Sequence, residues 1–254
     1  MKLTILGSGT STGVPEVGCT CLVCASSDAR DHRLRTSALV ETDSERILID
    51  CGPDFRQQVL SLPFRRIDAV LVTHEHYDHV GGLDDLRPFC RLAEEIPVYA
   101  DAYTAKHLRA RMPYCFAERK YPGVPRIRLE EALPGVTFQV GTTSVTPLQV
   151  MHGKLPILGY RIGSRLAYIT DLSSLPASQY AYLKGLDVLV INALREEPHP
   201  THQSLDEALT LAARIGARDT YLIHMSHHMG LHEVVSRKLP PHIHLAYDKE
   251  EIEF

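Results

Sequence analysis

Short apolar runs alternate with polar, glycine-rich or proline-rich segments along the chain, and these runs predict most of its secondary structure. Runs rich in β-branched residues predict strands at 3–6, 37–41, 46–50, 68–73, 136–150, 157–162, 166–170, 187–192, 220–224 and 242–246. Helical spacing predicts helices at 83–89, 104–111, 176–184, 208–215 and 230–238. A capping box formed by Ser204 and Glu207 opens the fourth of these. The proline-rich stretch 112–135 predicts a loop.

In both halves of the chain, strands mostly precede helices. This order is typical of an α/β layered architecture, in which helices cover the faces of a sheet. At 254 residues, the chain has enough length for one large hydrophobic core. We therefore expect a single α/β domain that covers residues 1–254.

The segment directly after the strand at 68–73 concentrates metal-ligating side chains. Residues 73–79 read THEHYDH and supply His74, His76, Asp78 and His79. A loop at the end of a core strand is where ligand sites tend to be built. Neutral imidazole and carboxylate are ligands that zinc, manganese and iron prefer. A polar surface loop that is histidine-rich by chance is the alternative, and the partners elsewhere in the chain argue against it.

Three more apolar strands end on residues of the same chemical kind. His152, Asp171 and His224 close the strands before them. Each residue alone is weak evidence, because a histidine at a strand end is more often a hydrogen-bonded structural residue. Together with THEHYDH they give seven ligands, enough for two divalent ions that share one carboxylate and a solvent molecule. Such a centre converts its bridging water to hydroxide near neutral pH.

A second cluster consists of Cys19, Cys21 and Cys24, three thiols within six residues. A structural zinc ion takes four ligands in a closed tetrahedron, so one further ligand is missing from this cluster. Free or redox-sensing thiols are the alternative.

Composition narrows the class of protein. The hydrophobic fraction of 44% and charged fraction of 23% are those of an ordinary soluble globular protein. With a net charge of −4, no global field favours nucleic acid or an anionic membrane. We find neither a signal peptide nor an 18-residue apolar run, so we expect no membrane association. The uneven cysteine spacing then favours a reducing, cytoplasmic location over a disulfide framework.

The motif HxHxDH, followed by His152, Asp171 and His224, resembles the metallo-β-lactamase fold hydrolases along nearly the whole chain. The glycine-rich segment 6–15, the cysteine cluster, the segment 152–160 and the pair Tyr247-Asp248 narrow the resemblance. They are similar to the PhnP-like cyclic phosphodiesterases, which are near relatives of the tRNA-processing nuclease RNase Z. The resemblance implies a four-layered αββα metallo-β-lactamase sandwich.

The resemblance also implies a role for each ligand. One active-site metal would be held by His74, His76 and His152. A second would be held by Asp78, His79 and His224, with Asp171 bridging the two ions, which would be manganese or zinc.

For the cysteine cluster, the resemblance implies a structural zinc ion whose fourth ligand is His227, three residues after His224. His228 and His232 are competing fourth ligands that spacing does not exclude.

Hydrolysis of a phosphodiester needs a nucleophile, stabilisation of charge on the phosphoryl oxygens and protonation of the leaving alkoxide. The resemblance implies that His202, just before the capping box, is the general acid. His199 is a nearby alternative. Asp78 is a second catalytic candidate, because it could position the attacking hydroxide as well as ligate metal.

The resemblance favours a small phosphodiester as substrate, such as a cyclic ribose or nucleotide phosphate. RNase Z carries a long basic arm between its third histidine and bridging aspartate. Here 18 residues separate His152 from Asp171, and they predict hairpin strands. With the negative net charge, this disfavours RNA. The rivals are an RNase Z-like tRNA 3′-end endonuclease and a non-hydrolytic, PqqB-like carrier; a carrier has no need of seven metal ligands.

A basic cluster lies in the proline-rich stretch and comprises Arg119, Lys120, Arg126 and Arg128. It could touch substrate phosphate, cover the site or form a homodimer contact. A solvated charged loop is the alternative.

Overall fold

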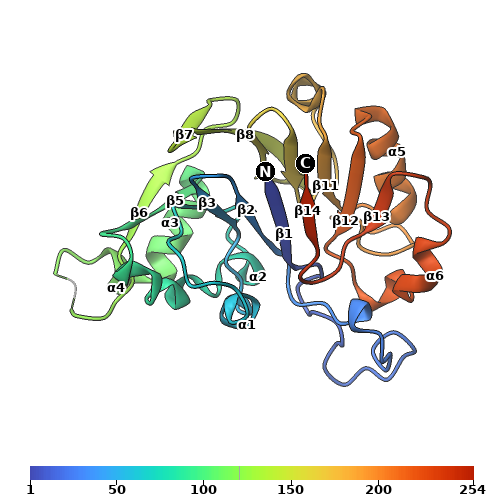
Figure 1. Ribbon diagram of the computed structural model, residues 1–254, viewed down its shortest axis with the longest axis horizontal. Helices are drawn as coiled ribbons and strands as arrows, with labels where there is room; N and C mark the ends of the chain where they lie inside the picture. Colours follow the sequence, from blue (N-terminus) through green and yellow to red (C-terminus); the bar gives the residue numbers. More distant parts are fainter. Residues whose placement is uncertain (120) are drawn as a thin grey trace.

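The computed structural model describes residues 1–119 and 121–254, which form two seven-stranded sheets that pack face to face (Figure 1). The first sheet has, in spatial order, β14 (Glu251–Glu253), β1 (Lys2–Gly7), β2 (Ser37–Glu41), β3 (Arg46–Ile49), β4 (Ala69–Leu71), β5 (Ile96–Ala100) and β6 (Ile127–Glu131). The second has β13 (Ile243–Leu245), β12 (Asp219–Ile223), β11 (Val188–Asn192), β10 (Leu166–Ile169), β9 (Leu155–Ile162), β8 (Thr143–His152) and β7 (Phe138–Val140).

Both faces of the central strands are apolar, which explains the continuous apolar runs in the sequence. In β3, Ile47 and Ile49 enter the core between the sheets, whereas Leu48 packs in the outer core beneath the helices. In β11, Val190 faces the other sheet and Leu189 faces the outer helices. Three stacked cores therefore separate four layers, and the predicted αββα sandwich is confirmed.

Helices cover the outer face of each sheet (Figure 1). Those packed with the first sheet are α1 (Phe55–Val59), α2 (Tyr77–Val80), α3 (Ala102–Arg111) and α4 (Pro113–Phe116); those packed with the second are α5 (Leu205–Ile215) and α6 (His232–Ser236). Short 3-10 helices span Ala29–Asp31, Leu83–Leu86, Phe89–Arg91, Ala177–Leu183 and His227–Met229. The capping box of Ser204 and Glu207 is present and opens α5. None of the described helices is both long and apolar enough to cross a membrane.

The prediction of a loop over 112–135 is wrong in part, because α4 and β6 lie within it. β6 reads Ile-Arg-Leu-Glu-Glu, and its charged residues suit the edge of a sheet rather than a buried strand. The sequence also missed β5, whose Pro97 weakens the strand signal, and β14, which is three residues long. Of the three missed strands, β6 and β14 thus lie at sheet edges and β5 lies next to one.

Two residues of the basic cluster have partners close by. Arg126 donates hydrogen bonds to backbone carbonyls of the segment 90–94. Arg128 forms ion pairs with two neighbouring glutamates. Lys120 lies outside the described residues. These contacts favour a structural role for Arg126 and Arg128 over contact with substrate.

Candidate active site

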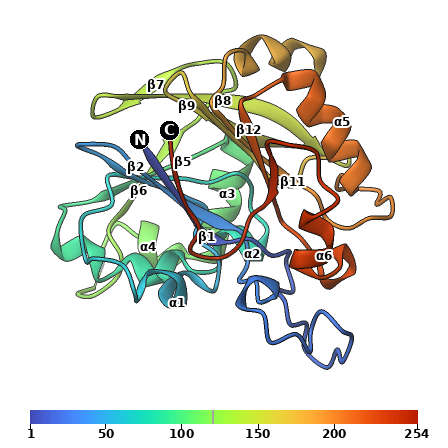
Figure 2. The same cartoon turned by 45° about the vertical axis from the view of Figure 1, so that its right-hand side comes forward.

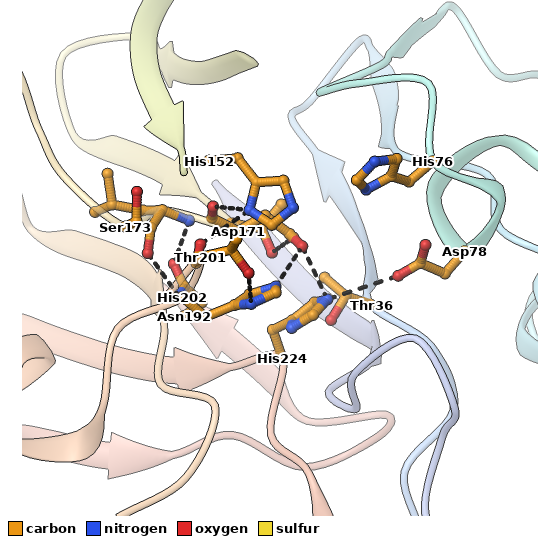
Figure 3. Close-up of polar contacts among 12 residues, drawn as sticks. Thr36, His76, Asp78, His152, Asp171, Ser173, Asn192, Thr201, His202 and His224 are labelled. Atoms are coloured by element: carbon orange, nitrogen blue, oxygen red, sulfur yellow. Dashed lines mark hydrogen bonds and ion pairs between the residues drawn. The ribbon is translucent and has the colours of Figure 1, made fainter. Parts of the chain in front are cut away.

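The predicted ligands meet at the ends of strands from both sheets. His74 follows β4, His152 ends β8, Asp171 follows β10 and His224 follows β12. Figure 3 shows His152, His202 and His224 around Asp171, while His76 and Asp78 approach from the other side. The backbones of Asp171 and His224 have φ of 55° and 58°, in the left-handed region that residues other than glycine rarely adopt. Such strain concentrates at functional sites, where it aims particular side chains.

The first group of ligand-type side chains comprises His74, His76 and His152. One ring nitrogen from each lies within 4.8 Å of the others. Nε2 of His74 is 3.0 Å from Nδ1 of His76. His74 and His152 are buried, whereas His76 is exposed, so this group opens towards solvent.

The second group comprises Asp78, His79 and His224, and their ligand atoms also lie within 4.8 Å of one another. Nε2 of His79 is 3.2 Å from Oδ2 of Asp78 and 3.3 Å from Oδ2 of Asp171. Nε2 of His224 is 3.1 Å from Oδ1 of Asp171. Asp171 also groups with His74, so its carboxylate lies where a bridging ligand would be needed.

Unpaired ring nitrogens test whether metal ions fit these groups. Nε2 of His79 and both ring nitrogens of His224 are buried and make no hydrogen bond of acceptable geometry within the described part of the chain, although carboxylate oxygens lie 3.1–3.3 Å from the two Nε2 atoms. An unsatisfied buried polar group costs about 1–3 kcal/mol. Imidazole nitrogens beside carboxylate oxygens form the donor set that zinc and manganese take. The residues fit divalent cations, and the ligand roles of the individual residues stay predictions.

The charges around the two groups favour a cation. Burial lowers the pKa of His79, but the carboxylates of Asp78, Asp171 and Asp50 outweigh burial and raise this pKa well above its ordinary value. Burial, together with the charge of His79, lowers the pKa of His74 well below its ordinary value, so this ring is neutral, as a metal ligand must be. The carboxylates thus favour positive charge at this site, which a metal ion would supply in place of the proton on His79, while the His74 ring is already neutral.

Asp50 is a site residue that the sequence analysis missed. Its Oδ2 is 2.7 Å from Nδ1 of His79, and its carboxylate accepts hydrogen bonds from the backbone and side chain of Thr73. Asp50 is fully buried and has a φ of 58°. A partner on Nδ1 leaves Nε2 of His79 to face the site, as outer-shell carboxylates do at metal centres. The signal was available, since Asp50 directly follows β3 just as the predicted ligands follow their strands.

A close backbone contact supports the same loop. A Cβ on Gly52 would lie 2.0 Å from the carbonyl oxygen of Asp78, and one on Gly82 would lie 2.0 Å from that of Gly52. The amide of Cys51 donates to the carbonyl of His79 across this contact. Only glycine permits this approach, which fixes α2 and its two ligand-type residues against the segment after Asp50.

His202 reaches the same carboxylate that joins the two groups. Its Nε2 is 3.1 Å from Oδ1 of Asp171, and its side chain is 12% exposed. Its ring stacks on that of His224, with centroids 4.9 Å apart. Burial lowers the pKa of His202, and the hydrogen bond with Asp171 opposes this shift. His202 also groups with His152 and Asp171 as a third possible ligand set. The geometry therefore allows His202 to act either as a general acid or as a metal ligand, and an experiment has to separate these two roles.

The cysteine cluster lies on a segment that extends from the body of the molecule on the side of α6 (Figures 1 and 2). Sγ of Cys19, Cys21 and Cys24 lies 3.1, 3.4 and 3.4 Å from Nδ1 of His227. The structure thus places His227 against all three thiols, whereas the ring of His232 contacts Arg33.

Two of these thiols differ in acidity. The backbone amide of Cys24 and the ring of His227 lower the pKa of Cys21 to about 6, whereas burial raises the pKa of Cys24 to about 11. A zinc ion would hold both as thiolates. The arrangement fits a closed structural site, and zinc binding there stays a prediction.

Replacement of Cys21 by serine should lower the melting temperature and the zinc content, by about one ion per chain, because a structural zinc site contributes folding energy. Turnover per folded, metal-loaded chain should change little. Calorimetry, metal analysis and activity would check this, with Cys90→Ser as a cysteine control that keeps its zinc. Loss of activity in a folded, fully metal-loaded Cys21→Ser variant would contradict a structural role.

Comparisons with known proteins agree with this geometry. A family model described as beta-lactamase superfamily domain matches residues 45–225. The chain therefore belongs to the beta-lactamase superfamily, and its fold is that of a metallo-β-lactamase fold hydrolase. Within the superfamily it is similar to the PhnP family: a crystal structure of a new diphosphatase from that family is 42% identical, with a TM-score of 0.92, and the match covers 100% of this chain and 96% of that one. The predicted resemblance is confirmed.

Two other proteins extend the comparison. An octanoyltransferase of Porphyromonas gingivalis is 50% identical over 250 residues, which make up 98% of this chain and 50% of that protein. The chain thus spans about half the length of this curated relative. Zn²⁺-bound PqqB from Methylobacterium extorquens shares the fold, with 22% identity, a TM-score of 0.83 and coverage of 100% of both chains.

Proposed function

We propose that the protein is a dinuclear, metal-dependent phosphodiesterase that hydrolyses small phosphodiesters, such as cyclic ribose or nucleotide phosphates. One observation carries the proposal: the carboxylate of Asp171 lies against both ligand-type groups and against His202. A phosphodiester bound there would have cation sites and a proton donor within one short span.

Two divalent ions, when bound, would supply a hydroxide nucleophile at neutral pH and stabilise charge on the phosphoryl oxygens. The residues of the chain supply the rest. Asp50 orients His79, and the carbonyls of Asp171 and Thr201 accept hydrogen bonds from Nδ1 of His152, each at 2.9 Å. His202 would hold on Nε2 the proton that the leaving alkoxide takes. Asp78 would orient the attacking water as well as ligate metal.

A small substrate is supported by the segment between His152 and Asp171. The predicted hairpin is present as β9 and β10, which pair antiparallel and leave no room in the sequence for an inserted arm. With the net charge of −4, this argues against a polyanionic RNA partner and against the RNase Z-like alternative. The full set of ligand-type residues argues against a PqqB-like carrier.

The names of the relatives bear on the reaction. Diphosphatase activity of the PhnP-family relative is also hydrolysis at phosphorus, and it adds phosphoanhydrides to the substrates to be tested. Octanoyl transfer is not assigned to this chain, because the match covers half of that protein. A single domain over 1–254, a cytoplasmic location and a homodimer stay predictions.

An assay of the metal-loaded protein tests the proposal. We expect turnover of 2′,3′-cyclic nucleotides or cyclic ribose phosphate, and of bis(p-nitrophenyl) phosphate as an activated diester. A nucleoside diphosphate and a tRNA precursor complete the panel. The near-isosteric variant Asp171→Asn should be inactive on every substrate. Cleavage of the tRNA precursor alone, or of no phosphodiester, would refute the proposal.

A further inference from the structure

His199 lies on the side of His202 that faces away from Asp171. Nδ1 of His202 is 3.2 Å from Nδ1 of His199 and 3.0 Å from Oγ1 of Thr201. Oγ1 of Thr201 is also 3.3 Å from Nδ1 of His199, so the hydroxyl contacts both rings. His202 is therefore held from two sides, by a carboxylate at Nε2 and by these two groups at Nδ1.

The backbone amide of Thr201 decides which histidine carries the proton between the two Nδ1 atoms. This amide donates a hydrogen bond to Nδ1 of His199 at 3.4 Å. Because an amide N–H only donates, Nδ1 of His199 is an acceptor and carries no proton. A proton between the two Nδ1 atoms would therefore belong to His202, whose Nδ1 also has Oγ1 of Thr201 as a neighbour. A general acid needs this arrangement, since a ring with its second proton on Nδ1 can release the one on Nε2.

The local sequence holds His199 in place. It lies between Pro198 and Pro200, whose rings fix their own φ angles, and Pro200 also restricts His199 to an extended backbone. The side chain is partly buried, and its ring centroid is 5.1 Å from that of His202. The contacts described for His199 are with Thr201 and His202. The ring of His202, the predicted acid, therefore connects His199 to Asp171.

We infer that His199 is a positioning residue for the proton donor: its Nδ1 accepts the Nδ1 proton of His202 and turns Nε2 of that ring towards Asp171 and the leaving group. The inference rests on the proposed function and assigns His199 a role other than that of alternative acid. The effect of replacing His199 on kcat should therefore depend on how strongly the leaving group needs protonation.

Two substitutions test the inference. His199→Leu removes the acceptor with little change in volume, and His199→Asn keeps an acceptor oxygen near the position of Nδ1. On a 2′,3′-cyclic nucleotide, whose alkoxide must be protonated, His199→Leu should lower kcat by about 10–100-fold, the range for outer-shell partners, with KM little changed. On bis(p-nitrophenyl) phosphate, which releases a stable phenolate, its effect should be small. His199→Asn should recover most of the loss.

Controls separate the possible failures. His107→Leu, on α3, should leave the turnover of both substrates unchanged. If His202→Ala shows a leaving-group-dependent loss and His199→Leu does not, the inference is wrong and the proposed function stands. If His202→Ala shows no such dependence, the proposed proton donor is wrong, and the inference is wrong with it. Loss of active-site metal from both His199 variants would assign the residue to metal binding and overturn the inference.

Discussion

Chelation of divalent metal should lower the rate of phosphodiester hydrolysis by at least about 10³-fold, because Lewis-acid stabilisation is worth several kcal/mol and each 1.36 kcal/mol is tenfold. Before chelation, metal analysis should find about three ions per chain, two in the active site and one in the cysteine cluster. Return of activity after separate addition of zinc and manganese would show which ions support turnover.

The metal content of two variants would show which ions belong to the active site and which belongs to the cysteine cluster. Asp171→Asn should lose active-site metal and keep the zinc of the cysteine cluster, since Asp171 lies against both ligand-type groups of the active site. Cys21→Ser should show the reverse pattern. A folded, active protein with one ion or none per chain would contradict a dinuclear centre combined with a structural zinc.

The candidate site was predictable from the sequence because its residues follow a local rule. A buried strand leaves a continuous apolar run, and the first polar residue after the run marks the sheet end, as His152 and His224 do. The spacing within THEHYDH places two further ligands on one turn of α2. The same rule would have found Asp50, which directly follows β3. Its hydrogen bond with His79 joins two segments that are distant in the sequence.

What the sequence left open depends on contacts through space. The choice of His227 over His228 follows from the short 3-10 helix after Ser226, which presents His227 to the thiols. The contact between His199 and His202 depends on the course of the segment 198–202, in which two prolines flank His199. Edge strands such as β6 were missed because one side of an edge strand has no neighbour and tolerates charge.

Replacement of His202 by alanine should lower turnover of an unactivated diester by roughly 10²–10⁴-fold with active-site metal retained, the usual contribution of a general acid. The loss should fall mainly on kcat, because the proton passes to the leaving alkoxide in the transition state. Rates on the cyclic nucleotide and on bis(p-nitrophenyl) phosphate, with metal content measured in parallel, would check this.

The same variant separates the two roles that the geometry allows His202. A general acid matters only when the leaving group is a poor one, so turnover of the activated aryl diester should be largely spared. A metal ligand in the set with His152 and Asp171 would instead affect both substrates and release metal on substitution. Nε2 of His202 lies 3.1 Å from Oδ1 of Asp171, and this position suits both a proton donor and a metal ligand. The two roles are therefore distinguished by measuring leaving-group dependence and metal content together. Unchanged turnover of the unactivated diester would remove His202 as the proton donor.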